Sequence, residues 1–174
     1  ENYSSGKKEI YQWGRDFPGE PGDIHLIDIS SKLFNGDEIK EIFAGDRTSF
    51  VLTTNGNVIG WGQNDMYSLG TGSKQEYSSS NPASPNIHSV ERLFVCPRHV
   101  FAIQKLKDSD IYTLYGWGDN SINQFGQSDW PLATTIPTPK RILDSSIPFA
   151  NIACSQSHSL YLLDDGELFI TGEG

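Results

Sequence analysis

The apolar residues of the chain come in short runs rich in β-branched and aromatic side chains, which Gly, Asn, Asp and Pro separate. This pattern is typical of β-strands joined by turns. A helical repeat would instead place apolar residues at i, i+3, i+4 and i+7 over ten or more positions. The sequence therefore predicts an all-β chain in which helix is confined to short turns.

Two segments show the pattern most clearly. Residues 44–62 (AGDRTSFVLTTNGNVIGWG) and 154–172 (CSQSHSLYLLDDGELFITG) align without a gap, and Asn55-Gly56 or Asp165-Gly166 divides each into two apolar runs. Such dipeptides favour type I′ turns, in which both central residues have a positive φ. We therefore predict hairpins with two-residue loops at both places. In the middle copy, residues 95–118, a longer polar loop around residues 107–110 replaces the tight turn.

The expected turn also predicts the register. A two-residue loop at 55–56 places Leu52 opposite Ile59 and Phe50 opposite Trp61, which leaves apolar residues on both faces. In a sheet with one solvent-exposed face, apolar and polar residues alternate along each strand instead. We therefore expect sheets that are covered on both sides, as the blades of a β-propeller are. In the last copy the same pairing groups Leu160, Leu162 and Phe169 on one face and Tyr161, Leu163, Leu168 and Ile170 on the other.

Trp-Gly dipeptides mark an internal repeat with a period of roughly 50 residues, in the range of repeat architectures. They occur at residues 13–14, 61–62 and 117–118, and Thr171-Gly172 stands in the same context. We interpret residues 1–174 as a single segment whose repeats span approximately 14–62, 63–118 and 119–174.

Residues 61–72 (WGQNDMYSLGTG) and 117–127 (WGDNSINQFGQ) resemble the repeat signature of the regulator-of-chromosome-condensation family, and residues 158–169 (HSLYLLDDGELF) resemble its other half. The resemblance implies blades of four-stranded antiparallel sheets, with about three blades of a seven-bladed ring and with degenerate repeats. Three blades cannot close a ring, so we expect the remaining blades to come from the same or another chain. The positions of the structural repeat signature are Trp13, Gly14, Trp61, Gly62, Asn64, Gly70, Trp117, Gly118, Asn120, Gly126 and His158.

Net charge, apolar runs and cysteine count limit the classes of molecule that this chain is expected to bind and the compartment in which we expect it. The formal net charge is −9 and the 13 Lys and Arg residues are scattered, whereas a nucleic-acid-binding surface needs clustered basic residues. We therefore expect no nucleic-acid binding by this segment. No run of eighteen apolar residues is present, so no membrane span is expected. Two cysteines make no disulfide framework, and we expect a reducing compartment, cytoplasmic or nuclear.

No group of residues predicts catalysis, a cofactor or a metal. His99 and His158 occupy equivalent repeat positions, which favours a hydrogen bond that ties a sheet to its neighbour or to a loop. Ser155 and Ser157 beside His158 lack the Gly-x-Ser-x-Gly elbow of a hydrolase. Cys96-x-x-His99 offers one pair of possible metal ligands, but the sequence contains no second pair of Cys or His at short spacing to complete a site. We therefore predict that Cys96 and Cys154 are small buried residues.

The function predicted from these observations is a protein–protein interaction scaffold, not an enzyme. The loops at 15–24, 74–86 and 127–139 differ between repeats, and partner-binding residues concentrate on such loops. Residues 74–86 read as an exposed loop. Trp130 is the residue that we expect to contact a partner, because aromatic side chains anchor interfaces. The alternative that the resemblance implies is guanine-nucleotide exchange on a small Ran-like GTPase.

Overall fold

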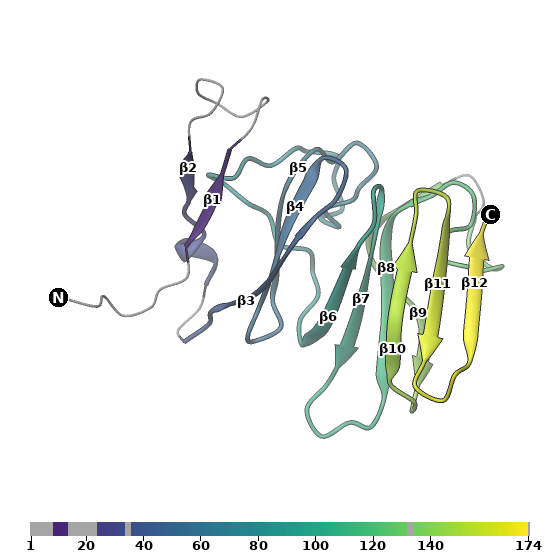
Figure 1. Ribbon diagram of the computed structural model, residues 1–174. Coiled ribbons are helices and arrows are strands. Elements are labelled where there is room, and N and C mark those ends of the chain that lie inside the picture. The colour runs from purple at the N-terminus through teal and green to yellow at the C-terminus, as the bar shows by residue number, and fades with distance from the viewer. Residues whose placement is uncertain (1–8, 14–23, 34–35, 132–133, 174) are drawn as a thin grey trace.

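The computed structural model describes residues 9–13, 24–33, 36–131 and 134–173, which form four antiparallel sheets that follow one another along the chain (Figure 1). Neighbouring strands in each sheet are consecutive in sequence. The one helical element of the described residues is a 3-10 turn, η1 (Ser30–Lys32). The prediction of an all-β chain is confirmed. The sheets are β1 (Ile10–Gln12) with β2 (His25–Ile27); β3 (Ile39–Ala44), β4 (Thr48–Thr53) and β5 (Val58–Gly62); β6 (Val90–Val95), β7 (His99–Lys105), β8 (Tyr112–Asn120) and β9 (Thr134–Ser145); and β10 (Phe149–Cys154), β11 (His158–Leu163) and β12 (Leu168–Gly172).

The outer edge of a sheet comes from the sequence that follows its Trp-Gly dipeptide. In the third sheet, β9 pairs with β8 beyond Trp117-Gly118. In the second sheet, isolated bridges join Gly60 to Ala83 and Gly62 to Tyr77 along β5. The predicted exposed loop at residues 74–86 is confirmed for most of its residues, but Tyr77 and Ala83 form isolated bridges with β5 and Ala83 is buried. The division into three repeats stays a sequence-based prediction.

The predicted two-residue turns are wrong by one residue. The Thr53 amide donates to the Asn57 carbonyl at 2.9 Å, and the Gly56 amide donates to the Thr53 carbonyl at 3.0 Å. Residues 54–56 thus form a three-residue loop in which Gly56, but not Asn55, has a positive φ. This is the loop in which a type I turn is followed by a glycine bulge. The loop at residues 164–166 has the same bonds.

The extra loop residue shifts the register, and a shift of one residue moves every side chain of a strand to the other face. Val58 pairs with Leu52 and Ile59 with Val51, so Ile59 does not lie opposite Leu52 as predicted. Trp61 pairs with Ser49, not with Phe50. In the last sheet Phe169 pairs with Tyr161 and leaves the face on which it was predicted.

Both faces of the second sheet are nevertheless buried, as the sequence predicted. Phe50 and Leu52 of β4 belong to the main core, which continues through the third sheet to Tyr161 of the fourth. Val51 and Trp61 pack in a separate cluster with Ile27 and residues around it. The face of the fourth sheet turned away from this core is open, because Leu168 and Ile170 are 52% and 69% exposed.

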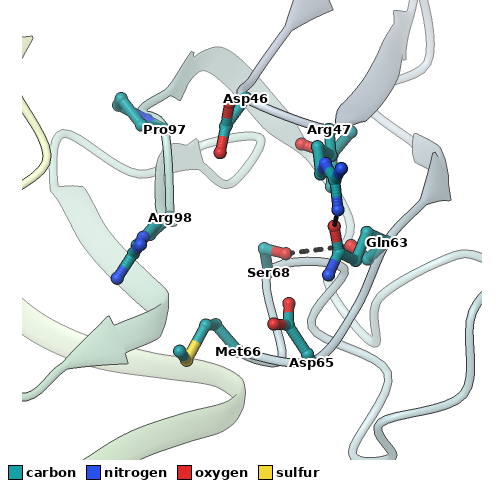
Figure 2. Close-up of a pocket in the computed structure, with 9 residues that line it drawn as sticks. Asp46, Arg47, Gln63, Asp65, Met66, Ser68, Pro97 and Arg98 are labelled. Carbon is teal, nitrogen blue, oxygen red and sulfur yellow. Dashed lines mark hydrogen bonds between the residues drawn. The ribbon is translucent and has the colours of Figure 1, made fainter.

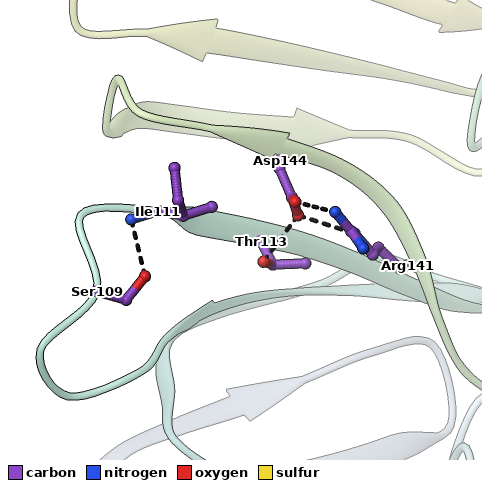
Figure 3. Close-up of polar contacts among 5 residues, drawn as sticks. All are labelled: Ser109, Ile111, Thr113, Arg141 and Asp144. Atoms are coloured by element: carbon purple, nitrogen blue, oxygen red, sulfur yellow. Dashed lines mark hydrogen bonds and ion pairs between the residues drawn. The ribbon is translucent and has the colours of Figure 1, made fainter.

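The longer loop predicted in the middle repeat is present between β7 and β8 (Figure 1). The Ser109 hydroxyl accepts a hydrogen bond from the Ile111 amide at 3.1 Å (Figure 3). Beside it on the sheet, Asp144 of β9 accepts from the Thr113 hydroxyl at 2.9 Å and pairs with Arg141 (Figure 3). Hydrogen bonds within the loop therefore hold the insertion, and the Asp144 contacts join β8 to β9 next to it.

Candidate functional site

Side chains from several sheets gather at one end of the molecule, which we call the Trp-Gly end. β5 and β8 reach it with their Trp-Gly dipeptides, and the turns at residues 45–47, 96–98 and 155–157 lie there because β3, β6 and β10 end there. The strands of each sheet form the core, so the loops at this end are available for contact with other molecules.

The signature tryptophans join each sheet to an earlier segment of the chain, a loop for Trp117 and strand β1 for Trp61. Trp117 is fully buried and its indole Nε1 donates to the Ser68 carbonyl at 2.9 Å. Trp61 is 5% exposed and donates to the Gln12 side chain at 3.1 Å. The prediction that both occupy equivalent buried positions is confirmed. Trp13 is 64% exposed, and Gly14 lies outside the described residues.

The signature asparagines close the loops that follow the Trp-Gly dipeptides. Asn64 accepts from the Leu69 amide at 2.9 Å and donates to the Ser73 carbonyl at 2.7 Å. Asn120 accepts from the Phe125 amide at 3.1 Å. Asn64 uses both halves of its amide, which donates and accepts, whereas the Asn120 Nδ2 is buried without a hydrogen-bond partner. These residues shape the Trp-Gly end without being free to bind a partner.

The glycines of these loops make room for the next sheet. Gly70 has a φ of +67°, and a Cβ atom there would lie 2.8 Å from the Trp117 ring. Gly126 has a φ of +68° and stands in the same relation to Thr171, the residue at the tryptophan position of the last repeat. The glycine and tryptophan positions of successive repeats are thus in direct contact.

The two histidines have the structural role that was predicted. His99 Nε2 and Ser159 Oγ are 3.1 Å apart, which ties β7 to β11 of the next sheet. His158 Nδ1 lies 2.8 Å from Ser155 Oγ within the β10–β11 turn. The Ser155 oxygen also accepts from the backbone amides of Ser157 and His158. These bonds hold the turn.

The burial of His99 leads to a prediction for stability. Burial lowers the pKa of His99 from 6.5 to about 4, against a smaller opposing effect of Asp119. The unfolded chain therefore binds a proton before the folded chain does, and stability should fall as pH drops from about 6.5 to about 4. The expected loss is about 3 kcal/mol at the lower limit. Denaturant melts across this range should show a weaker dependence in His99→Gln; an identical dependence would contradict the prediction.

The cysteines correct a prediction. Cys96 and Cys154 form a disulfide with a Cα–Cα distance of 5.7 Å, whereas the sequence predicted two separate small residues. The bond joins the β6–β7 turn to the end of β10, in the next sheet. The spacing of 58 residues could not show this pairing, because only the packing of two sheets brings the residues together.

The Trp-Gly end carries a polar pocket of about 200 Å³ between the second and third sheets (Figure 2). Arg47 donates to the Gln63 side chain at 2.7 Å along one side, and Arg98 lies on the other (Figure 2). Both signs of charge line it, which suits the side chains of a protein better than an apolar small molecule. Sequence reasoning missed this pocket because its residues come from three loops distant in sequence. They are Asp46, Arg47, Thr48, Gln63, Asp65, Met66, Ser68, Pro97 and Arg98.

Trp130, the predicted partner contact, is 5% exposed. Its ring packs 5.8 Å from that of Phe125, and the Lys140 ammonium lies 4.0 Å from the indole centroid. The surface here is therefore formed by Lys140 rather than by the indole, and a partner contact through Trp130 stays a prediction.

Comparisons with known proteins agree with this architecture. The family described as Regulator of chromosome condensation (RCC1) repeat matches residues 39–67. The ultraviolet-B receptor UVR8 of Arabidopsis thaliana is 27% identical over 98% of this chain and 38% of its own length. The guanine nucleotide exchange factor SRM1 of Saccharomyces cerevisiae is 26% identical over 98% of the chain and 36% of its own length.

Solved structures show the same fold. The crystal structure of Prp20p from Saccharomyces cerevisiae, a protein whose binding to Gsp1p and histones is known, superimposes with a TM-score of 0.73. It is 25% identical, over 94% of this chain and 39% of that protein. Human WBSCR16 has the fold at 19% identity and a TM-score of 0.64. The chain thus spans under two fifths of these relatives, and the predicted blade fold is confirmed.

Proposed function

We propose that this chain, which is similar to the RCC1-like repeat proteins, is a regulatory protein-interaction module. The observation that carries the proposal is the Trp-Gly end, where loops from successive sheets present polar groups around a pocket. Relatives such as UVR8 and SRM1 are mostly receptors or exchange factors rather than classical enzymes. The partner would be a protein, with a small GTPase as one class.

We place the contact at the pocket because its charged groups are accessible. Arg47 is exposed and Arg98 is half-buried, and each extends from a turn between two paired strands. Arginine is enriched at interface hot spots, since its planar guanidinium binds carboxylates and stacks on aromatic rings. The net charge of −9 adds a general attraction for basic partners.

Reversing the charge of Arg98 should weaken partner binding. We expect Arg98→Glu to lower the affinity for a Ran-class GTPase or for core histones, the partner types of Prp20p, by about tenfold or more. The matched control is Lys107→Glu, the same change in net charge on the exposed β7–β8 loop at the opposite end. Titration calorimetry of the full chain measures both. Equal losses in the two variants would place the contact elsewhere, and the proposed face would be wrong.

The second candidate function is guanine-nucleotide exchange, favoured by the match to SRM1 across nearly the whole chain. A loop inserted against a GTPase needs no side-chain chemistry, so the scaffold and the exchange factor share one surface. Release of a fluorescent GDP from a Ran-class GTPase separates them. If the chain accelerates GDP release and Arg98→Glu abolishes that acceleration, the result supports nucleotide exchange. If the chain binds the GTPase without accelerating GDP release, the result supports a scaffold.

Two further parts of the proposal concern the surroundings of the chain. The exposed apolar residues Leu162, Leu168 and Ile170 of the last sheet would be covered by further propeller sheets of the same or another chain, because such patches attract apolar surface.

We also propose a cytoplasmic or nuclear location. No helix of the described residues is long and apolar enough to cross a membrane.

A further inference from the structure

Three potential metal ligands meet between the third and fourth sheets. Cys96, His99 and Cys154 each offer a ligand atom, and these atoms all lie within 4.8 Å of one another. Cys96 and His99 are buried and Cys154 is half-buried. The sequence showed only the pair Cys96-x-x-His99. The third potential ligand, Cys154, comes from β10 of the next sheet.

The His99 imidazole has an unused nitrogen. Its Nε2 shares a hydrogen with Ser159 Oγ at 3.1 Å, whereas its Nδ1 is buried and has no hydrogen-bond partner. The side chain is fully shielded from solvent, and leaving a buried polar atom unpaired costs about 1–3 kcal/mol. If Nε2 donates to the serine, Nδ1 carries a free lone pair, which is the form of histidine that binds metals.

The next sheet contains a turn with the same backbone hydrogen bond, in which the histidine nitrogen has a partner. The Cys96 amide donates to the His99 carbonyl at 2.9 Å, and the Ser155 amide donates to the His158 carbonyl at 2.9 Å. In the second turn the serine Oγ lies 2.8 Å from Nδ1 of the histidine. The equivalent position in the first turn holds Cys96, whose sulfur forms no hydrogen bond with the buried His99 Nδ1.

We propose that Cys96, Cys154 and His99 bind one thiophilic d¹⁰ metal ion, Zn²⁺ or Cu⁺, when the disulfide is reduced. Two thiolates and an imidazole are the ligands that these ions prefer. A thiolate pair on Zn²⁺, with bonds of about 2.3 Å, needs its sulfurs about 3.8 Å apart. Once the bond is reduced, rotation of the two side chains would bring the sulfurs to that distance, because their Cα atoms are 5.7 Å apart.

The chemistry balances with a dithiol as the reductant. The dithiol gives two electrons and two protons to the Cys96–Cys154 bond and becomes a disulfide itself. Binding of the metal then releases the two thiol protons to solvent. Two thiolates with Zn²⁺ form a neutral site, which suits a buried position. A water would be the fourth ligand of Zn²⁺, whereas Cu⁺ needs no fourth ligand. In the cytoplasmic or nuclear location proposed above, thiols are kept reduced.

The test uses the full chain, reduced with a dithiol, freed of metal and desalted without oxygen. Titration with Co²⁺ as a probe for Zn²⁺ should give a sulfur-to-cobalt charge-transfer band that saturates at one ion per chain, and Zn²⁺ should displace the probe. A chromophoric Cu⁺ chelator measures the other ion by competition. The oxidised chain should bind neither ion, a comparison that requires no mutation.

Substitutions distinguish the proposed metal ligands from residues that only lie near them. Cys154→Ser should weaken binding at least about 100-fold, and His99→Gln about 10–100-fold, with circular dichroism confirming that each remains folded. The control is His158→Gln, which removes the histidine of the matched turn without a cysteine and should leave the affinity unchanged. Absence of a one-to-one complex in the reduced chain overturns the proposal. Equal effects of His99→Gln and His158→Gln, or full affinity in Cys154→Ser, overturn it as well.

Discussion

Replacing Trp117 with alanine is expected to lower the free energy of unfolding by about 3–5 kcal/mol, the usual cost of truncating a buried aromatic side chain. The Trp117 indole is fully buried, and its Nε1–H donates to the Ser68 carbonyl at 2.9 Å. The variant therefore leaves a cavity between two sheets together with an unpaired carbonyl, and each effect adds to the loss.

Trp13→Ala is the matched control for this prediction. Trp13 belongs to the same repeat signature but is 64% exposed, so its truncation should change the free energy of unfolding by less than about 0.5 kcal/mol. Urea melts of the full chain, followed by circular dichroism, measure both variants. A loss below about 1 kcal/mol for Trp117→Ala would show that the sheets do not depend on this contact.

Gly118→Ala should destabilise the chain by about 2–5 kcal/mol. A Cβ atom at this position would lie 2.6 Å from the Arg98 carbonyl oxygen and 2.8 Å from the Cα atom of His99, both on the neighbouring strand or its turn. Backbone atoms cannot rotate away, so the strands must separate, at about 1–3 kcal/mol. The φ of +103° adds about 1–2 kcal/mol for a residue with a side chain.

The control Gly166→Ala separates these two contributions. Gly166 has a φ of +92°, and nothing lies within 4 Å of a Cβ atom built there. Its substitution should therefore cost only the backbone term of about 1–2 kcal/mol. Equal losses in the two variants, measured by the same melts, would mean that the close approach to Arg98 does not limit residue 118.

The sequence was sufficient for the fold because the repeat encodes it several times. Apolar runs, turn dipeptides and Trp-Gly positions predicted antiparallel sheets buried on both faces, and Trp61 and Trp117 are buried at equivalent places. The register was predicted wrongly, although the turn residues were identified. Asn55-Gly56 is compatible with a two-residue or a three-residue loop, and the choice depends on the φ of Asn55, which no local pattern determines.

The candidate site was less accessible to sequence reasoning. Arg47 and Arg98 occupy equivalent turns but carry no signature, and the pocket between them exists only because two sheets stand next to each other. Trp130 was singled out as an aromatic residue in a variable loop, yet its ring packs on Phe125. A loop residue and a core residue look alike in sequence when the loop folds back onto the core.

The sequence by itself determined local properties of the chain. These are the residues that form strands, the positions that require glycine and the positions at which the repeat signature recurs. These properties depend on backbone sterics and on the alternation of side chains within a few residues. The tertiary structure alone decided the pairs formed across sheets, such as Cys96 with Cys154 and His99 with Ser159. Residues about 60 positions apart meet there because the sheets pack face to face, and that distance is set by the whole core rather than by any segment of the chain.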